Sequence, residues 1–164
     1  MFTISDVLEA LTHARPTNFD QEFLEAVIDS RLATPGALFV AIPGENVDGH
    51  DFLSQAFANG ATAALIERSV APVEGAQQPW LTVDVTSDSL SNVALNEVRE
   101  WQGPYCLLVH NTVEALQKIA AHHRRKYNPR VIGITGSVGK TTTKEMISQV
   151  LAQKYITQKT EGNF

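Results

Sequence analysis

The residues with the clearest chemical potential form a run near the C-terminal end, Ile132-Gly133-Ile134-Thr135-Gly136-Ser137-Val138-Gly139-Lys140-Thr141-Thr142-Thr143. An apolar segment, a glycine-punctuated turn and a Lys-Thr pair that opens a helix are the layout of a phosphate-binding loop. Backbone N–H groups of such a turn and of the helix N-terminus converge on an anion. Lys140 adds a mobile positive charge for the outer phosphates, and the Thr141 hydroxyl can ligate Mg²⁺.

The loop is a variant of the general pattern G-x-x-x-x-G-K-[ST]. Its first glycine would fall at position 134, which is Ile, and glycines stand instead at 133 and 136. The apolar residues around it predict a strand over 130–135, and the apolar spacing after it predicts an amphipathic helix over 140–153. This context favours a phosphate loop over the alternative, a glycine-rich turn followed by a solvated lysine.

The length and charge of the chain limit its function classes. Its 164 residues correspond to one ordinary domain, or to one small domain and part of another. The net charge of −5 argues against nucleic-acid binding. The short basic cluster at 122–126 is interpreted as the solvated C-terminal end of a helix, with phosphate contact as the alternative.

The cysteine content and the absence of a long apolar run predict a soluble, cytoplasmic protein. The single cysteine, Cys106, excludes an internal disulfide framework and lies in an apolar run, so we expect a small buried residue rather than a nucleophile. The N-terminus lacks the pattern of a secretory signal. No apolar segment approaches the roughly 20 residues needed to span a bilayer.

Hydrophobic periodicity predicts alternating helices and strands, which is typical of an α/β fold. Helices are expected over 4–11, 51–59, 87–101 and 113–126, and strands over 23–28, 37–42, 62–66, 80–85 and 107–109. The helix over 4–11 has Thr3 as its expected N-cap. The side chains expected to face inward from the second and fourth helices are Phe52, Leu53, Ala56 and Phe57, and Val113, Leu116, Ile119 and Ala120. Asn128-Pro129 is the expected domain boundary.

A family resemblance is carried by motifs spread over most of the chain in matching order. They are Asp29-Ser30-Arg31, Pro35-Gly36-Ala37-Leu38-Phe39-Val40-Ala41, Gly44, Asp48-Gly49-His50-Asp51-Phe52, Gly60-Ala61, Thr112 to Ala120, Thr135 to Met146, and Thr160-Glu161-Gly162-Asn163-Phe164. Together they resemble the Mur ligases, and among these most closely the members that add D-alanyl-D-alanine. Segment 85–105 departs from the family pattern because it is longer than expected.

The resemblance implies an α/β fold in two parts. Residues 1–128 would form a small N-terminal α/β domain that binds a UDP-sugar. Residues 129–164 would form the first strand, phosphate loop and helix of a P-loop ATPase-type domain, of which only this beginning is expected here. One strand and one helix bury little surface, so we expect this second part not to be stable alone.

The resemblance also implies roles for individual residues. For the ATP phosphates, the implied contacts are Gly136, Ser137, Val138, Gly139, Lys140, Thr141 and Thr142. Lys140 and Thr141 would be catalytic, with Thr141 also the Mg²⁺ ligand. For the UDP-sugar, the implied contacts are Ser30, Arg31, Asn46, His50, Asn111, Thr112 and Asn163. Two of these assignments have structural alternatives: Asp29-Ser30-Arg31 as a simple capped turn, and His50 as a residue that fixes its loop by hydrogen bonding.

The reaction implied by the resemblance is ATP-dependent amide formation in peptidoglycan precursor synthesis, with ATP and Mg²⁺ as cofactors. UDP-N-acetylmuramoyl-tripeptide and D-alanyl-D-alanine would be the substrates, joined through an acyl phosphate. The full-length protein is expected to be a monomer without nucleic-acid or membrane partners, and the 164-residue chain alone is expected not to catalyse ligation.

Three other readings remain open at this point. The first is a sibling ligase that adds another amino acid, or a folylpolyglutamate-type ligase. The second is a UDP-sugar-binding module without catalysis. The third, a small nucleotide kinase or GTPase, is disfavoured because those proteins carry the phosphate loop near the start of their domain.

Overall fold

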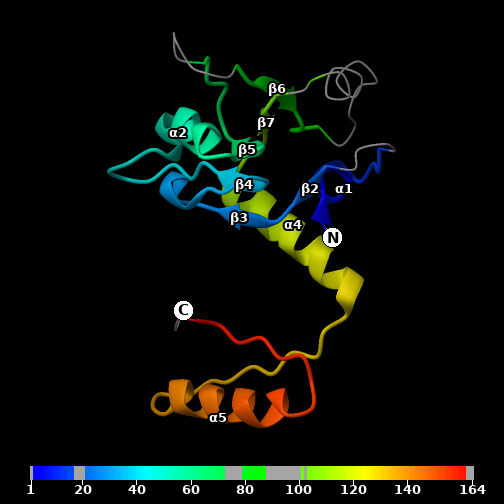
Figure 1. Cartoon of the computed structure of the whole chain (residues 1–164), viewed down its shortest axis with the longest axis vertical. Coiled ribbons are helices and arrows are strands. Elements are labelled where there is room, and N and C mark those ends of the chain that lie inside the picture. The colour runs from blue at the N-terminus through cyan, green and yellow to red at the C-terminus, as the bar shows by residue number, and fades with distance from the viewer. Residues whose placement is uncertain (1, 17–20, 73–78, 88–100, 102, 162–164) are drawn as a thin grey trace. The chain divides into compact units, whose positions relative to one another are not determined.

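The computed structural model describes residues 2–16, 21–72, 79–87, 101 and 103–161. The chain divides into two compact units, Met1–Asn128 and Pro129–Phe164. Both are drawn in Figure 1, and each is considered by itself.

The centre of the first unit is a five-stranded parallel sheet (Figure 1). Its strands lie in the order β3, β4, β5, β7, β6, and their bounds are Glu25–Val27, Ala37–Val40, Ala63–Ile66, Tyr105–Leu108 and Leu81–Asp84 respectively. The register pairs Leu38 with Ala63 and Ala63 with Tyr105. All four residues of β4 are buried, as expected for an apolar run that is covered on both faces.

Helices cover both faces of this sheet. Two helices, α1 (Ile4–Thr12) and α4 (Thr112–Tyr127), pack on one face, where Leu38, Leu65 and Leu107 belong to the same core as Ile119. The short helix α2 (Leu53–Ala58) packs on the other face, in a second core with residues of β4, β5 and β7. Successive strand residues point to opposite faces, so one strand supplies both cores. The α/β class expected from the sequence is confirmed.

The first helix begins as its sequence predicts. Thr3 is the N-cap of α1, its side chain accepts from the Asp6 N–H, and the Asp6 carboxylate accepts from the Thr3 N–H at 3.0 Å. This reciprocal pair is a capping box, which satisfies two backbone donors at the helix start. Just before α1, strand β1 (Phe2–Thr3) pairs antiparallel with β2 (Glu22–Phe23).

Some expected elements differ from those observed. The strand expected over 23–28 is interrupted at Leu24, whose N–H donates to the Gly36 carbonyl, so that β2 and β3 are separate. The helix expected over 51–59 is shorter, because a 3₁₀ turn, η2 (Gly49–Phe52), precedes α2. That turn leaves Phe52 38% exposed, while Leu53, Ala56 and Phe57 are buried as predicted. The helix expected over 87–101 falls almost entirely outside the described residues.

The face that α4 buries is also shifted from the predicted one. Thr112, Ala115 and Ile119 are buried, whereas Val113 and Ala120 are exposed and Leu116 is half-buried. The buried positions follow the i, i+3, i+7 spacing of one helical face, and Thr112 leads that face. The apolar residue next to it, Val113, therefore points away from the sheet.

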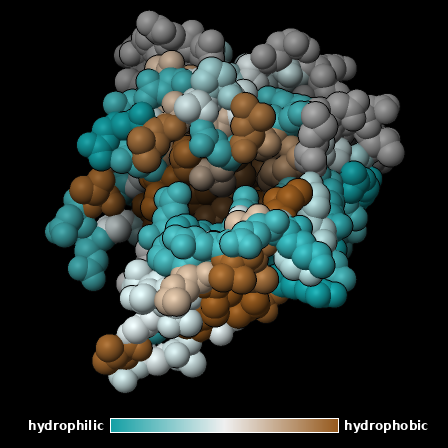
Figure 2. Space-filling view, turned by 60° about the horizontal axis from the view of Figure 1, so that its bottom comes forward, coloured by the Kyte–Doolittle hydropathy of each residue, from teal (hydrophilic) through white to brown (hydrophobic). Residues whose placement is uncertain are grey.

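The second unit contains the helix α5 (Lys140–Ala152) and extended chain on either side of it. The strand predicted over 130–135 is wrong: this segment makes no ladder with another described strand, and Val131 and Ile132 are exposed. No residue of α5 is buried. Further exposed apolar side chains of this unit are Val138, Met146, Val150, Tyr155 and Ile156. Figure 2 shows hydrophobic side chains among hydrophilic ones on the face in view.

Within the described part of the chain, no helix has both the length and the apolar character needed to cross a membrane.

Candidate functional site

The glycine turn of the second unit leads directly into α5. Gly139 is the N-cap of this helix with φ +80°, and Gly136 has φ +150°, a region that L side chains rarely adopt. Because glycine has no side chain, the N-cap Gly139 makes no side-chain hydrogen bond to the first amides of α5. The Nζ of Lys140 donates to the Gly136 carbonyl at 2.6 Å.

This geometry suits an anion. The helix N-terminus carries the positive end of the helix dipole, and Lys140 folds over the turn that precedes it. Ser137, Val138, Thr141 and Thr142 are all exposed around the same turn. A phosphate at this position would meet backbone donors, an ammonium group and hydroxyls, the donor set that ATP–Mg²⁺ requires.

In the first unit, the predicted polar residues share one edge of the sheet. Ser30 and Arg31 follow β3, Asn46 and His50 follow β4, and Asn111 follows β7. Because the sheet is parallel, the carboxyl ends of these strands lie at the same edge. Open α/β sheets bind their ligands outside this edge.

His50 is 2% exposed and both of its ring nitrogens have partners. Its Nδ1 lies 2.6 Å from the Asp48 carboxylate, and its Nε2 accepts from the Glu67 N–H at 2.8 Å. The pKa of Asp48 is lowered, chiefly because its carboxylate accepts hydrogen bonds from the backbone N–H and from the ring of His50. Arg68 donates a further hydrogen bond to the same carboxylate. His50 therefore fixes the loop after β4 to the end of β5.

Thr112 is fully buried at the start of α4, and both of its donors go to one carboxylate. Its N–H lies 2.7 Å and its Oγ1 2.9 Å from Glu67 Oε1. Asn111, the N-cap, accepts the Glu114 N–H at 2.8 Å. Glu67 thus links the end of β5 to the start of α4, and it belongs to none of the motifs recognised in the sequence.

Asp29, Ser30 and Arg31 form a compact capped 3₁₀ turn. Ser30 is buried and its hydroxyl donates to Gln55 Oε1 of α2 at 2.7 Å. The Arg31 guanidinium holds Asp29 at 2.7 Å and remains 78% exposed. Its hydrogen bonds lower the Asp29 pKa to about 2. The guanidinium of Arg31 is therefore accessible, while the Ser30 hydroxyl is engaged inside the unit.

The remaining predicted contacts differ in how far the structure brings them together. Asn46 is exposed at the tip of the loop that the Pro43–Asp48 bridge closes. Asn163 lies outside the described residues. Of the predicted set, the structure joins His50 and Thr112 through Glu67. The sequence signal for Glu67 is its position directly after an apolar strand, and this signal gains meaning only when the strand order places that position at the edge where ligands bind.

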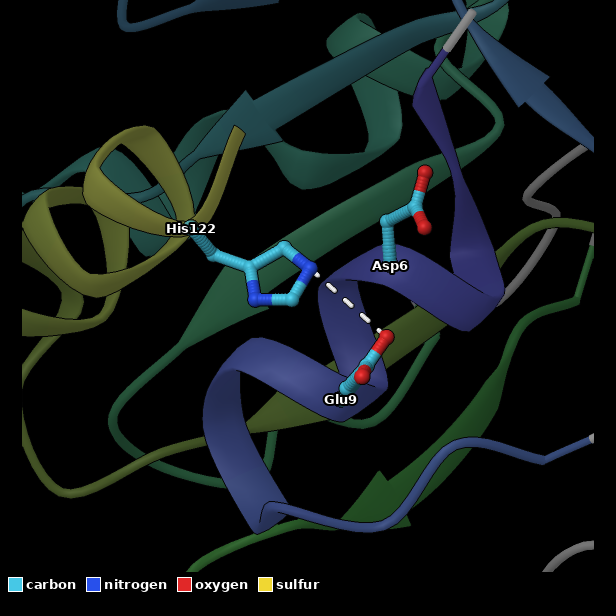
Figure 3. A group of neighbouring side chains, drawn as sticks. All are labelled: Asp6, Glu9 and His122. Carbon is cyan, nitrogen blue, oxygen red and sulfur yellow. Dashed lines mark ion pairs between the residues drawn. The ribbon is translucent and has the colours of Figure 1, made fainter. Parts of the chain in front are cut away.

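A separate titratable cluster joins α1 to α4 (Figure 3). Asp6, Glu9 and His122 have possible ligand atoms within 4.8 Å of one another, and His122 Nε2 lies 3.6 Å from Glu9 Oε2. Two cations already contact these carboxylates: Arg15 bridges Asp6 and Glu9, and Lys126 contacts Asp6. We therefore interpret the cluster as an ion-pair network rather than a metal centre, and part of the basic segment 122–126 is paired rather than solvated.

Cys106 is buried in β7, and burial raises its pKa to about 12. A thiol with so high a pKa is not a nucleophile at neutral pH. The prediction that this residue is structural is confirmed.

Comparison with known proteins places these features in a family. Residues 25–124 match the model of the Mur ligase family catalytic domain, and residues 134–164 match that of the Mur ligase middle domain. Similar curated proteins are UDP-N-acetylmuramoyl-tripeptide–D-alanyl-D-alanine ligases. The one from Bacillus subtilis is 36% identical over 99% of this chain, and the one from Escherichia coli is 37% identical over 85%.

Solved structures of Mur ligases resemble the chain as well. A MurF structure from Acinetobacter baumannii is 27% identical, covers 92% of this chain and gives a TM-score of 0.60. MurF from Thermotoga maritima in complex with ADP is 28% identical, covers 89% and gives a TM-score of 0.55. The chain spans 30% of the Bacillus subtilis relative's length and 25% of the Escherichia coli relative's length. Because the catalytic-domain model alone matches more than half of its residues, the chain belongs to the Mur ligase family.

Proposed function

We propose that the full-length protein is an ATP-dependent ligase that joins D-alanyl-D-alanine to UDP-N-acetylmuramoyl-tripeptide. The observation that carries this proposal is the match to a relative of that name, which is 36% identical and extends over 99% of this chain. Such a reaction would place the protein in peptidoglycan precursor synthesis, and so in cell-wall biogenesis, cell shape and division. We place it in the cytoplasm, where ATP is supplied, acting as a monomer.

The proposed chemistry has two balanced steps. The carboxylate that ends the tripeptide attacks the γ-phosphorus of ATP, so that an acyl phosphate forms and ADP leaves. The amine of D-alanyl-D-alanine then attacks the acyl carbon, an amide bond forms, and phosphate departs with the amine giving up a proton. The physical difficulty lies in the first step, because a carboxylate must approach a polyanion.

The turn from Gly136 to Thr142 is suited to lower this repulsion, because its donors would neutralise part of the negative charge of the phosphates. Helix α5 offers its N-terminal amides, and Lys140 supplies a positive charge that now rests on the Gly136 carbonyl. We assign Thr141 as the Mg²⁺ ligand and Thr142 as a further phosphate contact. Bound Mg²⁺ would supply charge neutralisation at the phosphates. The Thermotoga maritima relative was solved in complex with ADP, which supports the proposal that the full-length protein binds an adenine nucleotide.

The UDP-sugar is assigned to the first unit, at the carboxyl edge of its sheet. The accessible guanidinium of Arg31 is suited to a diphosphate through charge-assisted hydrogen bonds. Further contacts are proposed from Asn46 and Asn111, and from Asn163 outside the described residues. Ser30, His50 and Thr112 are buried with their polar atoms engaged, so we assign them to shaping this edge rather than to direct contact with the ligand. On this basis residues 1–128 are a UDP-sugar-binding domain, and residues 129–164 belong to an ATP-binding domain.

Substitution of Lys140 tests the proposal. We expect Lys140→Ala in the full-length protein to lower the rate of ligation by about 10²- to 10³-fold, the usual cost of losing one charge-stabilising donor. Lys154→Ala is the matched control, because it removes an equally charged side chain from the same unit, where Lys154 lies over the Tyr155 ring. The assay follows phosphate release that depends on both UDP-N-acetylmuramoyl-tripeptide and D-alanyl-D-alanine.

Two outcomes would contradict the proposal. Equal rates in the two variants would remove Lys140 from the phosphate site. Turnover with a single amino acid in place of D-alanyl-D-alanine would identify a sibling ligase instead.

A further inference from the structure

The carboxylate of Glu67 occupies a junction between three segments of the first unit. Glu67 directly follows β5, and its Oε1 accepts from both the N–H and the hydroxyl of Thr112 at the start of α4. Its own N–H donates to Nε2 of His50, in the turn after β4. These three segments are separated by 17 and 45 positions in the sequence, so the junction is a tertiary feature.

The hydrogen bonds at this junction fix one state of His50. Because Nε2 accepts the Glu67 N–H, it carries no proton, and the ring proton lies on Nδ1, which donates to Asp48. The tautomer and the ring plane are therefore set by two partners. Arg68, next in the chain, contacts the same Asp48 at 3.0 Å and completes the attachment.

The same junction occupies the N-terminus of α4. A helix start attracts anions, and here the Glu67 carboxylate takes the Thr112 N–H while Asn111 takes the Glu114 N–H. Two of the donors that a diphosphate could use are thereby already engaged within the protein. The ligand must find its charge partners elsewhere along this edge, as at the exposed guanidinium of Arg31.

We propose that Glu67 is a positioning residue for the UDP-nucleotide site, holding the loop after β4 and the start of α4 in the arrangement that receives the ligand. The assignment of the ligand rests on the proposed function. The immobilisation of Thr112 and His50 by Glu67 rests only on the contacts above. Glu67 itself is not assigned a contact with the ligand.

Three variants of the full chain separate this role from a general loss of stability. Glu67→Ala removes the acceptor, and Glu67→Gln keeps an oxygen that can accept both Thr112 donors without the charge. Glu114→Ala is the matched control, because it removes the same charge from an exposed side chain near the same helix start. Titration calorimetry with UDP-N-acetylmuramoyl-tripeptide measures the affinity, and amide hydrogen exchange measures protection of the Thr112 N–H.

We expect Glu67→Ala to weaken nucleotide binding about tenfold and to lose protection at Thr112, since a buried donor pair is left without its acceptor. Glu67→Gln should stay within about threefold of the parent chain, because the hydrogen bonds are rebuilt. Glu114→Ala should match the parent chain in both measurements. If Glu67→Ala does not fold, Thr112→Val, which deletes only the hydroxyl donor, should weaken binding by about threefold and keep the fold.

The experiment distinguishes a failure of the ligand assignment from a failure of the positioning role of Glu67. A parent chain that binds no UDP-nucleotide but loses Thr112 protection in Glu67→Ala would overturn the ligand assignment and keep the junction. A Glu67→Ala variant that is folded, keeps Thr112 protected and binds with unchanged affinity would overturn the positioning role. Equal weakening in Glu67→Gln and Glu67→Ala would also overturn the positioning role, because it would assign the effect to the charge of Glu67 rather than to the hydrogen bonds that hold Thr112.

Discussion

At the scale of single residues, several of the polar groups that the sequence singles out in the first unit are held by partners close to them in the sequence. His50 is held by Asp48, Asn111 caps α4, and Arg31 grips Asp29 two residues away. Side chains held in this way lose little further freedom when a ligand arrives, which lowers the entropic cost of binding. The same contacts make several of these residues important for stability as well as for recognition.

Asp6 is the residue whose titration should be visible in the stability of the first unit. Burial raises its pKa, but the Lys126 and Thr3 hydrogen bonds and the charges of Lys126 and Arg15 outweigh this, and the net pKa falls from 3.8 to about 2. A lowered folded-state pKa means that stability is fully present above about pH 5 and is lost as the pH falls through 2. The contribution is about 2 kcal/mol.

The check is urea unfolding between pH 7 and pH 2, comparing the parent chain with Asp6→Asn. We expect the free energies of unfolding to differ most near pH 7 and to converge toward pH 2, because the asparagine cannot ionise. A difference that stays constant over this range would show that Asp6 stabilises the unit by packing alone.

At the scale of secondary-structure elements, the features that depend on neighbouring residues follow the sequence pattern, and those that depend on tertiary contacts do not. The N-cap at Thr3 and the buried run of β4 depend on neighbouring residues, and both are observed. The strand expected over 130–135 fails because extended chain forms a strand only when another strand pairs with it. The helical spacing predicts Phe52 inward, but this residue ends the 3₁₀ turn η2, which has no distinct sequence pattern, and its side chain is exposed.

The candidate site shows the same division. The glycine turn before α5 is encoded by consecutive residues and could be recognised directly. Glu67 could not, since its partners lie 17 and 45 positions away and only the fold brings them together. An isolated glutamate after an apolar strand resembles any solvated side chain until the strand order is known.

The start of α1 offers a test at this scale. Thr3→Ala should destabilise the first unit by about 1 kcal/mol, because the Asp6 N–H loses its cap and the capping box opens. Thr3→Ser is the control that keeps the hydroxyl and should stay within a few tenths of a kcal/mol. Urea unfolding monitored by circular dichroism measures both. A full loss in the serine variant would assign the effect to the threonine methyl group instead.

At the scale of the whole molecule, the two units differ sharply in how much they bury. The first contains two apolar cores on either side of a sheet, whereas α5 in the second has no buried residue. Helices in proteins owe most of their stability to packing of an apolar face. The second unit is therefore expected to open far more often than the first.

Limited proteolysis of the 164-residue chain checks this expectation. Cleavage should occur first within 129–164 and leave a resistant product that ends close to Asn128, identified by intact mass. Hydrogen exchange should agree, with α5 amides exchanging well before those of β4 and β5. Simultaneous loss of both parts would show that the two units unfold together.

The burial of Cys106 has a practical consequence. It is the only cysteine in the sequence, it lies inside β7, and its thiol has a pKa near 12, so maleimide and iodoacetamide reagents find no reactive thiolate in the folded chain. A cysteine introduced at Val47, a position 59% exposed in the loop after β4, then becomes the single labelling site. A fluorophore attached there reports directly on the proposed nucleotide edge, and this 164-residue chain needs no cysteine removed beforehand.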